Sequence, residues 1–190
     1  MNRRTWLQSL FVSAAAAAGV GLSARALAAA APQSREIEAL QKNWRTLLAE
    51  GVRPPAPTDK LKLSNDGWRK RLDKMQYNVL REEGTERAGT SPLNNEKRAG
   101  VYACAGCDLP LFTSEMKYDS GTGWPSYFTT IPGVFETKTD RHLLYARTEY
   151  HCARCGGHHG HIFEDGPKPT GLRYCNNGVA LKFIPKSAKA

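Results

Sequence analysis

Two Cys-x-x-Cys pairs constrain the fold of this chain more than any other feature of its sequence. The first pair is Cys104 and Cys107, and the second is Cys152 and Cys155. Thiolates are preferred zinc ligands, and two such pairs can close a tetrahedral four-sulfur site. A single Cys-x-x-Cys is often a redox dithiol, but a second matched pair favours a structural metal. We therefore predict one structural zinc ion, without an open coordination position for catalysis.

A fifth cysteine, Cys175, is left over and is a candidate nucleophile. Arg173 lies two residues earlier, so on a strand both side chains would share a face, where the positive charge would favour thiolate over thiol. His158 and His161 could reach the same pocket and transfer protons near neutral pH. The alternative is a buried, inert thiol with histidines bonded to backbone groups.

The segment Gly-Thr-Gly-Trp-Pro-Ser, residues 121–126, adds a fixed aromatic side chain. Two glycines and a proline around Trp124 predict a loop that holds the indole in place, where it could form the apolar wall of a small pocket. An ordinary packed tryptophan is equally consistent with this spacing.

The periodicity predicts short helices followed by a β domain. Residues 64–66 can cap a helix that runs through Trp68 and Leu72, and residues 75–81 predict a second one. From residue 100, short apolar runs alternate with Gly, Pro, Asp and Asn, which favours antiparallel strands. The strand candidates are residues 101–103, 109–113, 134–136, 142–149 and 179–184.

The N-terminus is typical of a twin-arginine export signal. Arg3 and Arg4 precede an alanine-rich apolar run, and Ala26-Leu27-Ala28 offers a small-x-small cleavage site. A membrane anchor and an amphipathic helix are the alternatives, but the run is short for a span. We predict a signal over residues 1–28, a helix and Pro-rich linker over 29–60, and a catalytic domain over 61–190. Twin-arginine export predicts a folded protein in an oxidising compartment, the periplasm.

The net charge of +9 gives little reason to expect a nucleic-acid partner. Arg3, Arg4 and Arg25 belong to the predicted signal, which leaves +6 on the mature chain. The remaining basic residues are spread along the sequence, often beside acids, a pattern typical of solubility. We expect neither nucleic-acid binding nor stable membrane association after signal cleavage.

Several motifs together resemble a known family. CAGC, GTGWPS and CARCGGHHGHIFEDGPKPTGLRYCNNG occur in the order found in the zinc-containing methionine-R-sulfoxide reductases. The resemblance extends over residues 61–183 and includes the segment Arg-Glu-Glu-Gly-Thr-Glu, residues 81–86. It implies a mainly β fold of two antiparallel sheets in a tent-like arrangement, with short N-terminal flanking helices and a structural four-cysteine zinc site.

The resemblance also implies roles for the candidate residues. Cys175 would attack the sulfur of the R epimer of methionine sulfoxide and would be left as a sulfenic acid. His158 and His161 would assist proton transfer to the sulfoxide oxygen. Arg173 and Asn177 would line the pocket, and Trp124 would pack on the methyl group of the substrate.

The chain departs from the family pattern at four positions. His159 replaces the usual leucine, and we expect its ring at the surface. Asn176 replaces a commonly apolar residue, and Gly178 a frequent serine. Thr122 stands where a common subgroup has its resolving cysteine. We therefore predict direct reduction of the sulfenic acid by an external thiol, such as a thioredoxin-like protein. We also expect the enzyme to be a monomer that repairs oxidised exported proteins.

Three other classes of protein are alternative interpretations of this sequence. A zinc-ribbon binding module would leave the Gly-Trp-Pro loop and the His-x-x-His motif without a purpose. A zinc deaminase needs a His-x-Glu motif ahead of Pro-Cys-x-x-Cys, and this chain has neither. A dithiol oxidoreductase that uses both Cys-x-x-Cys pairs would be distinguished by its metal content.

Overall fold

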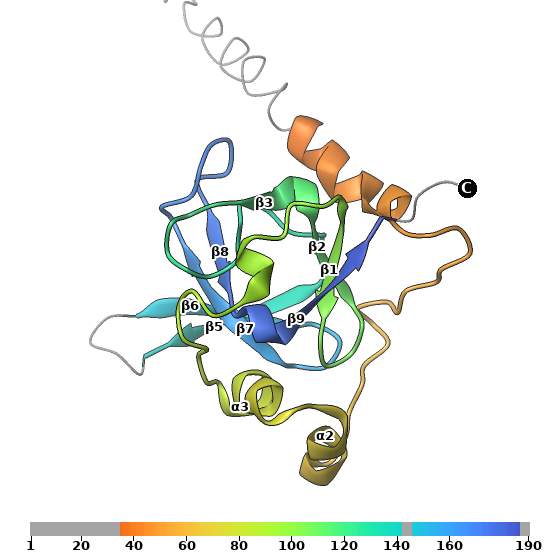
Figure 1. Cartoon of the computed structure of the whole chain (residues 1–190), viewed down its shortest axis with the longest axis vertical. Helices are drawn as coiled ribbons and strands as arrows, with labels where there is room; N and C mark the ends of the chain where they lie inside the picture. Colours follow the sequence, from red (N-terminus) through yellow and green to blue (C-terminus); the bar gives the residue numbers. More distant parts are fainter. Residues whose placement is uncertain (1–34, 142–145, 187–190) are drawn as a thin grey trace, which may run out of the picture. The chain divides into compact units, whose positions relative to one another are not determined.

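The computed structural model describes residues 35–141 and 146–186 (Figure 1). The predicted export signal, residues 1–28, lies outside these ranges, and the domain boundaries after residues 28 and 60 stay predictions. Within the described ranges, no helix is long and apolar enough to cross a membrane.

The described chain starts with a helix that packs on the β domain. Residues 35–42 are helical and continue into the 3-10 helix η1 (Asn43–Leu47). Leu47 is buried, and η1 contacts the first two strands. Gln41 Nε2 donates a hydrogen bond to Thr129 Oγ1 at 2.8 Å. The Pro-rich segment that follows is also attached, because Lys60 Nζ binds Glu136 at 2.7 Å.

Both predicted helices of the folded domain are confirmed. In α2 (Asn65–Arg71), the Ser64 side chain accepts a hydrogen bond from the amide of Gly67, which satisfies an N-terminal donor of the helix. In α3 (Lys74–Glu82), Asp73 and Gln76 form a capping box. Glu83 ends α3 in a left-handed conformation, with φ of 57°.

Two antiparallel sheets form the rest of the domain, so the expected mainly β fold with short helices is confirmed. The smaller sheet has the order β2-β1-β9, and the larger has the order β3-β4-β8-β7-β6-β5. The strands are β1 (Gly100–Cys104), β2 (Pro110–Thr113), β3 (Lys117–Tyr118), β4 (Ser126–Tyr127), β5 (Phe135–Asp140), β6 (Arg147–Cys152), β7 (His158–Phe163), β8 (Arg173–Asn176) and β9 (Leu181–Pro185). Three further 3-10 helices occur in the described chain: η2 (Pro92–Asn94) precedes β1, and η3 (Ser114–Met116) and η4 (Gly178–Ala180) lie between strands.

The predicted strands correspond to β1, β2, β5, β6 and β9, although residues 142–145 of one candidate lie outside the described ranges. The short strands β3 and β4, and also β7 and β8, are not among the predicted strands. The sequence of β7, His-His-Gly-His-Ile-Phe, lacks the apolar alternation that marks a half-buried strand. Strands β7 and β8 are stabilised instead by their neighbours in the middle of the larger sheet.

Aromatic side chains fill the core. Phe112 stacks on Tyr127 with ring centroids 3.9 Å apart and an interplanar angle of 9°. Phe135 packs edge-on against Tyr150 at 4.7 Å. Phe112 belongs to the smaller sheet and the other three to the larger, so these rings join the two sheets.

Candidate functional site

The four predicted zinc ligands come together in the structure. Cys104 ends β1 and Cys107 lies in the following turn, while Cys152 ends β6 and Cys155 follows it. The Sγ atoms of Cys104 and Cys155 are 3.7 Å apart, and those of Cys107 and Cys152 are 3.5 Å apart. Disulfide sulfurs lie ~2.05 Å apart, whereas four thiolates ~2.3 Å from one zinc are separated by about 3.8 Å. The four cysteines are therefore positioned to bind a metal ion.

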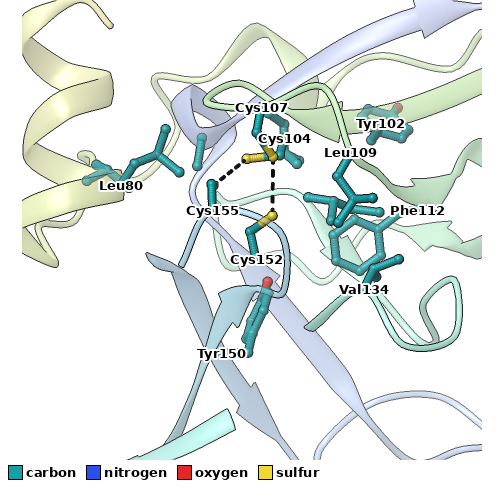
Figure 2. Close-up of a cluster of buried hydrophobic side chains, with 14 of the residues drawn as sticks. Leu80, Tyr102, Cys104, Cys107, Leu109, Phe112, Val134, Tyr150, Cys152 and Cys155 are labelled. Atoms are coloured by element: carbon teal, nitrogen blue, oxygen red, sulfur yellow. Dashed lines mark hydrogen bonds between the residues drawn. The ribbon is translucent and has the colours of Figure 1, made fainter. Parts of the chain in front are cut away.

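The cysteine cluster lies inside the core and bridges the two sheets. All four sulfur ligand atoms lie within 4.8 Å of one another, and all four residues are buried. Figure 2 shows them between Leu80 of α3 and the aromatic side chains of the sheets. Arg81 Nη1 donates a hydrogen bond to the carbonyl of Cys155 at 2.9 Å, and Arg154 Nη1 to that of Cys107 at 2.7 Å. Such bonds orient the turns that carry the ligands.

Cys175 belongs to a row of side chains that crosses the larger sheet. The pairing register places Lys138 opposite Glu149, Glu149 opposite His161, and His161 opposite Cys175. Ser126 of β4 pairs with Cys175 on its other side. Directly opposite residues in antiparallel strands project from the same face of the sheet. His161 is therefore the immediate neighbour of the Cys175 thiol.

A pocket of about 130 Å³ opens at Cys175. Its lining includes Trp124, Arg147, His161, Phe163, Cys175 and Asn177. Four predicted site residues are thus brought to one cavity: the cysteine, one histidine, the tryptophan and the asparagine. His158 and Arg173 are not part of this lining.

Trp124 is held in place by the loop that follows α3. Its indole Nε1 donates a hydrogen bond to the carbonyl of Glu86 at 3.1 Å. The amide of Gly89 donates to the carbonyl of Gly123 at 2.8 Å. Gly123 has a φ of +87°, and a Cβ there would lie 2.9 Å from the amide nitrogen of Gly89. Only glycine permits this approach, which fixes the indole at the pocket wall.

Glu86 is a positioning residue that was not among the predicted site residues. Its amide donates to Asn177 Oδ1 at 2.9 Å, and its carboxylate accepts from the amides of Gly178 and, at 3.0 Å, Val179. Burial raises the pKa of the Glu86 carboxyl above its ordinary value. Asn177 Nδ2 donates to the carbonyl of His159 at 3.1 Å. The Asn177 amide is thus bonded to backbone groups while it lines the pocket.

The two predicted histidines have different partners. His161 Nε2 lies 2.9 Å from Asp140 Oδ2, and Arg147 Nη2 lies 2.6 Å from the same oxygen. Because a carboxylate only accepts, this contact assigns the proton to Nε2 and the lone pair to Nδ1 in the neutral ring. Burial lowers the pKa of His161, against the pull of Asp140. The ring is therefore a neutral proton acceptor in the resting site.

His158 is buried beside Glu149. Its Nδ1 contacts Glu149 Oε1, and burial lowers the pKa of His158 to about 4. The ring lines a neighbouring polar pocket of about 210 Å³ together with Asp140 and Glu149. His161 and Arg147 line both pockets, so the two cavities are adjacent.

The pKa of the Cys175 thiol is raised, whereas the sequence predicts that the charge of Arg173 favours the thiolate. Burial raises the pKa of the Cys175 thiol above its ordinary value, and the charge of Arg173 only partly opposes this. The guanidinium makes two hydrogen bonds to Asp165, at 2.8 and 2.7 Å, and lies 4.3 Å from the Phe163 ring centroid. Much of the Arg173 charge is thus compensated by Asp165, so the thiol is protonated at rest.

Replacing Asp165 by asparagine should lower the pKa of Cys175. The change removes a negative charge that raises this pKa and leaves the Arg173 charge uncompensated. The thiolate form should then persist to lower pH, so the midpoint of the titration should shift down. The rate of Cys175 alkylation by iodoacetamide, followed by intact mass against pH, measures the shift. Cys175→Ser gives the background from the other thiols, and an unchanged midpoint would contradict the assignment.

The expectation that His159 lies at the surface is wrong, because this residue is fully buried. Its ring lies 5.6 Å from that of Phe135 and 6.3 Å from that of Tyr150, measured between centroids. Burial lowers the pKa of His159 to about 3, so the ring is neutral. The ring packs against these aromatic side chains of β5 and β6, so the imidazole fills the space of an apolar side chain.

The other unusual positions near Cys175 also have structural reasons. Asn176 is buried, and Tyr150 Oη donates to its Oδ1 at 2.9 Å. A Cβ at Gly178 would lie 1.9 Å from Ser91 Oγ, so no side chain fits there. The Thr122 hydroxyl hydrogen-bonds Ser120 Oγ at 2.8 Å. A hydrogen bond between Thr122 and Cys175 lowers the pKa of the thiol and so partly offsets the effect of burial. Thr122 therefore lies within reach of the Cys175 sulfur.

Comparison with known proteins places this geometry in a family. The SelR domain family matches residues 72–185. A protein named peptide methionine sulfoxide reductase MsrB from Agrobacterium fabrum is 51% identical over 127 residues, covering 66% of this chain and 94% of the relative. Another of that name from Pseudomonas putida is 54% identical over 121 residues, or 63% and 90% of the two chains. Peptide methionine sulfoxide reductase B1, chloroplastic, from Arabidopsis thaliana is 40% identical over 190 residues, 96% and 94%.

Proposed function

This chain belongs to the SelR family and is a peptide-methionine (R)-S-oxide reductase, and from this premise we propose that Cys175 carries the reaction as its nucleophile. The proposal is supported above all by one observation. Cys175 lies opposite His161 on adjacent strands, at a pocket with Trp124 in its wall. This combination offers the thiol, the proton carrier and the apolar contact that sulfoxide reduction needs.

The pocket suggests how the substrate is held. The methyl group of methionine sulfoxide packs against the Trp124 indole, which the Glu86 carbonyl orients. Phe163 adds a second apolar surface. The sulfoxide oxygen then faces His161, because that ring is the titratable neighbour of the thiol. Arg173 and His158 act from behind the lining, by compensating charge and by positioning polar groups.

His161 transfers the proton. Asp140 holds the Nε2 proton, so Nδ1 accepts the proton of Cys175, and the imidazolium that forms is stabilised by the Asp140 carboxylate. The thiolate attacks the sulfoxide sulfur and forms an S–S bond, while His161 returns the proton to the sulfoxide oxygen. The hydroxyl group then moves from the methionine sulfur to the Cys175 sulfur as the S–S and S–O bonds to the methionine sulfur break, which leaves Cys175 as a sulfenic acid and releases methionine. One thiol and one sulfoxide thus become one sulfenic acid and one thioether, with cysteine sulfur oxidised and methionine sulfur reduced by two electrons.

Recycling uses an external thiol in this proposal. Four of the five cysteines lie in the buried cluster, and Thr122 lies where a resolving cysteine would be needed. An external thiol attacks the sulfenic acid, water leaves, and a second thiol releases Cys175 from the mixed disulfide. We assign the reductant to a thioredoxin-like protein and the substrates to oxidised exported proteins, with export by the twin-arginine signal predicted over residues 1–28.

We assign zinc to the four-cysteine cluster as a structural ion. The sulfur separations of 3.5 and 3.7 Å suit a tetrahedral ion of this size. Four thiolates leave no position for water, so the ion supplies stability and no step of the reduction.

A single turnover with a sulfenic-acid trap tests the mechanism. Reduced wild-type protein is mixed with one equivalent of R-methionine sulfoxide in the presence of dimedone, and the products are read by intact mass and peptide mapping. We expect one methionine released and one dimedone adduct per chain, on Cys175. Methionine release with loss of two hydrogens and no adduct would show that a cluster thiol resolves Cys175. Absence of both products would favour the inert thiol.

Introducing a thiol at position 122 should change this outcome. In Thr122→Cys, the new thiol lies within reach of Cys175 and should attack its sulfenic acid, giving an intramolecular disulfide and water. We expect loss of two hydrogens in place of the dimedone adduct. Thr122→Ser, which keeps a hydroxyl, is the matched control and should still give the adduct. An adduct of unchanged yield in Thr122→Cys would contradict the proposed access of residue 122 to the oxidised sulfur.

A further inference from the structure

Two histidine rings converge on one carboxylate oxygen beside the polar pocket. His151 Nε2 lies 2.9 Å from Glu149 Oε1, and His158 Nδ1 contacts the same oxygen. Potential metal-ligand atoms of all three residues lie within 4.8 Å of one another. The three residues belong to β6 and β7, which hold them in register. The cluster is distinct from the four cysteines.

His151 Nε2 has no hydrogen-bond partner, although it lies beside Glu149. Nδ1 of the same ring lies 3.3 Å from the carbonyl of Gly156, which only accepts, so this contact suits a proton on Nδ1 and a lone pair on Nε2. Nε2 is buried and has no hydrogen-bond partner of acceptable geometry among the described residues. A bound cation would give this nitrogen a partner.

The surroundings favour a cation at Glu149 Oε1. Lys138 Nζ lies 3.2 Å from the other oxygen, Oε2, and also contacts Glu83, so it leaves Oε1 to the two rings. Glu82, Glu83 and Asp140 line the polar pocket beside Glu149. Among the described residues, Glu83 and Glu149 contact Lys138, and Asp140 contacts Arg147. The pocket of about 210 Å³ gives an ion and its water ligands access to Glu149 and His158.

We propose that Glu149, His151 and His158 form a second metal site, for a divalent first-row transition ion such as Zn²⁺ or Co²⁺. Two imidazole nitrogens and one carboxylate oxygen suit these ions, and three protein ligands leave positions for water. In contrast to the cysteine cluster, this site is at the edge of a pocket and exchanges its ion. A bound ion engages His158 and Glu149 next to the Cys175 pocket, so it inhibits the reductase reversibly. This last consequence rests on the proposed function, whereas metal binding does not.

Cobalt binding tests the site directly. Zinc-loaded Cys175→Ser protein, which lacks the free thiol, is titrated with Co²⁺ and followed by visible absorption and by metal analysis after gel filtration. We expect one Co²⁺ per chain in addition to the retained zinc, with ligand-field bands but without thiolate-to-cobalt charge transfer. His151→Gln in the same background should weaken binding at least ~10-fold through loss of one ligand. Glu136→Gln is the matched control, since Glu136 pairs with His151 across β5 and β6 but is exposed and outside the cluster.

Inhibition is measured separately on the otherwise wild-type enzyme. Added Zn²⁺ should lower the rate of R-methionine sulfoxide reduction, a mild chelator should restore it, and His151→Gln should keep its basal rate and lose the zinc sensitivity. Absence of Co²⁺ binding, or equal binding in His151→Gln, would overturn the metal site and leave an imidazolium–carboxylate pair. Binding without inhibition would overturn the regulatory role. Undiminished reductase activity in Cys175→Ser with intact Co²⁺ binding would refute the proposed function and not the site.

Discussion

Replacing Cys175 by serine should abolish sulfoxide reduction, with a fall in kcat of roughly 10³-fold or more. A hydroxyl has almost the same size as a thiol but is a much poorer nucleophile at sulfur, and it cannot form the sulfenic acid. The pocket should survive, because Trp124, Asn177 and His161 are held by other groups. Methionine release from R-methionine sulfoxide with dithiothreitol measures the effect.

The same variant must retain the fold for this result to be informative. Its Tm and metal content should match those of the wild type, because the buried cluster contains only the other four cysteines. Substantial residual turnover in Cys175→Ser would mean that a thiol of the cluster reduces the substrate, as a dithiol oxidoreductase would.

Asp140→Asn tests the role of His161, since it keeps the Cys175 thiol but weakens the hydrogen bond that supports the His161 ring. It should lower kcat with little change in KM.

Loss of one ligand from the four-cysteine cluster should unfold the domain. The apparent free energy of structural zinc binding is about 10–16 kcal/mol in zinc-finger peptides, and a whole domain is stable by only about 5–15 kcal/mol. In Cys152→Ser, the ligand lost is the last residue of β6, at the junction of the two sheets. We expect loss of tightly bound metal and of the cooperative thermal transition, measured by metal analysis and circular dichroism.

Cys175→Ser is the matched control for this experiment, because it removes a thiol without touching the cluster. Chelation of the wild type under mild denaturing conditions should reproduce the behaviour of Cys152→Ser, and addition of Zn²⁺ should reverse it. A folded Cys152→Ser domain with normal Tm would show that packing of the aromatic core alone maintains the fold, and would refute the structural role of the metal.

Local sequence patterns were sufficient for the helices and for the clustering of the four cysteines. The capping residues Ser64 and Asp73 bond to amides three residues away, so their effect is visible in a short window of sequence. Each Cys-x-x-Cys pair is likewise local, and tetrahedral geometry leaves few alternatives for two pairs. Cys175 was identified by elimination as the thiol that remained.

Partners from distant strands could not be predicted in the same way. Asp140 and Glu149 carry no motif, and their roles appear only when β5, β6 and β7 are paired in register. Glu86 contacts Asn177 across 91 residues of sequence. The surface prediction for His159 was wrong because β7 was not recognised as a central strand. The pKa of Cys175 depends on burial and on Asp165, which the spacing to Arg173 cannot reveal.

The four-cysteine cluster also has a consequence for the unfolded chain. Cys104 and Cys155 are 51 positions apart, so an ion shared by them closes a long loop. In a chain-entropy model, a cross-link over such a span disfavours the unfolded state by about 4 kcal/mol. Extracellular domains commonly obtain this effect from a disulfide, which thiol reductants can open. A metal cross-link leaves the thiols in the reduced state, so the reductant that regenerates Cys175 would not dismantle the scaffold that positions it.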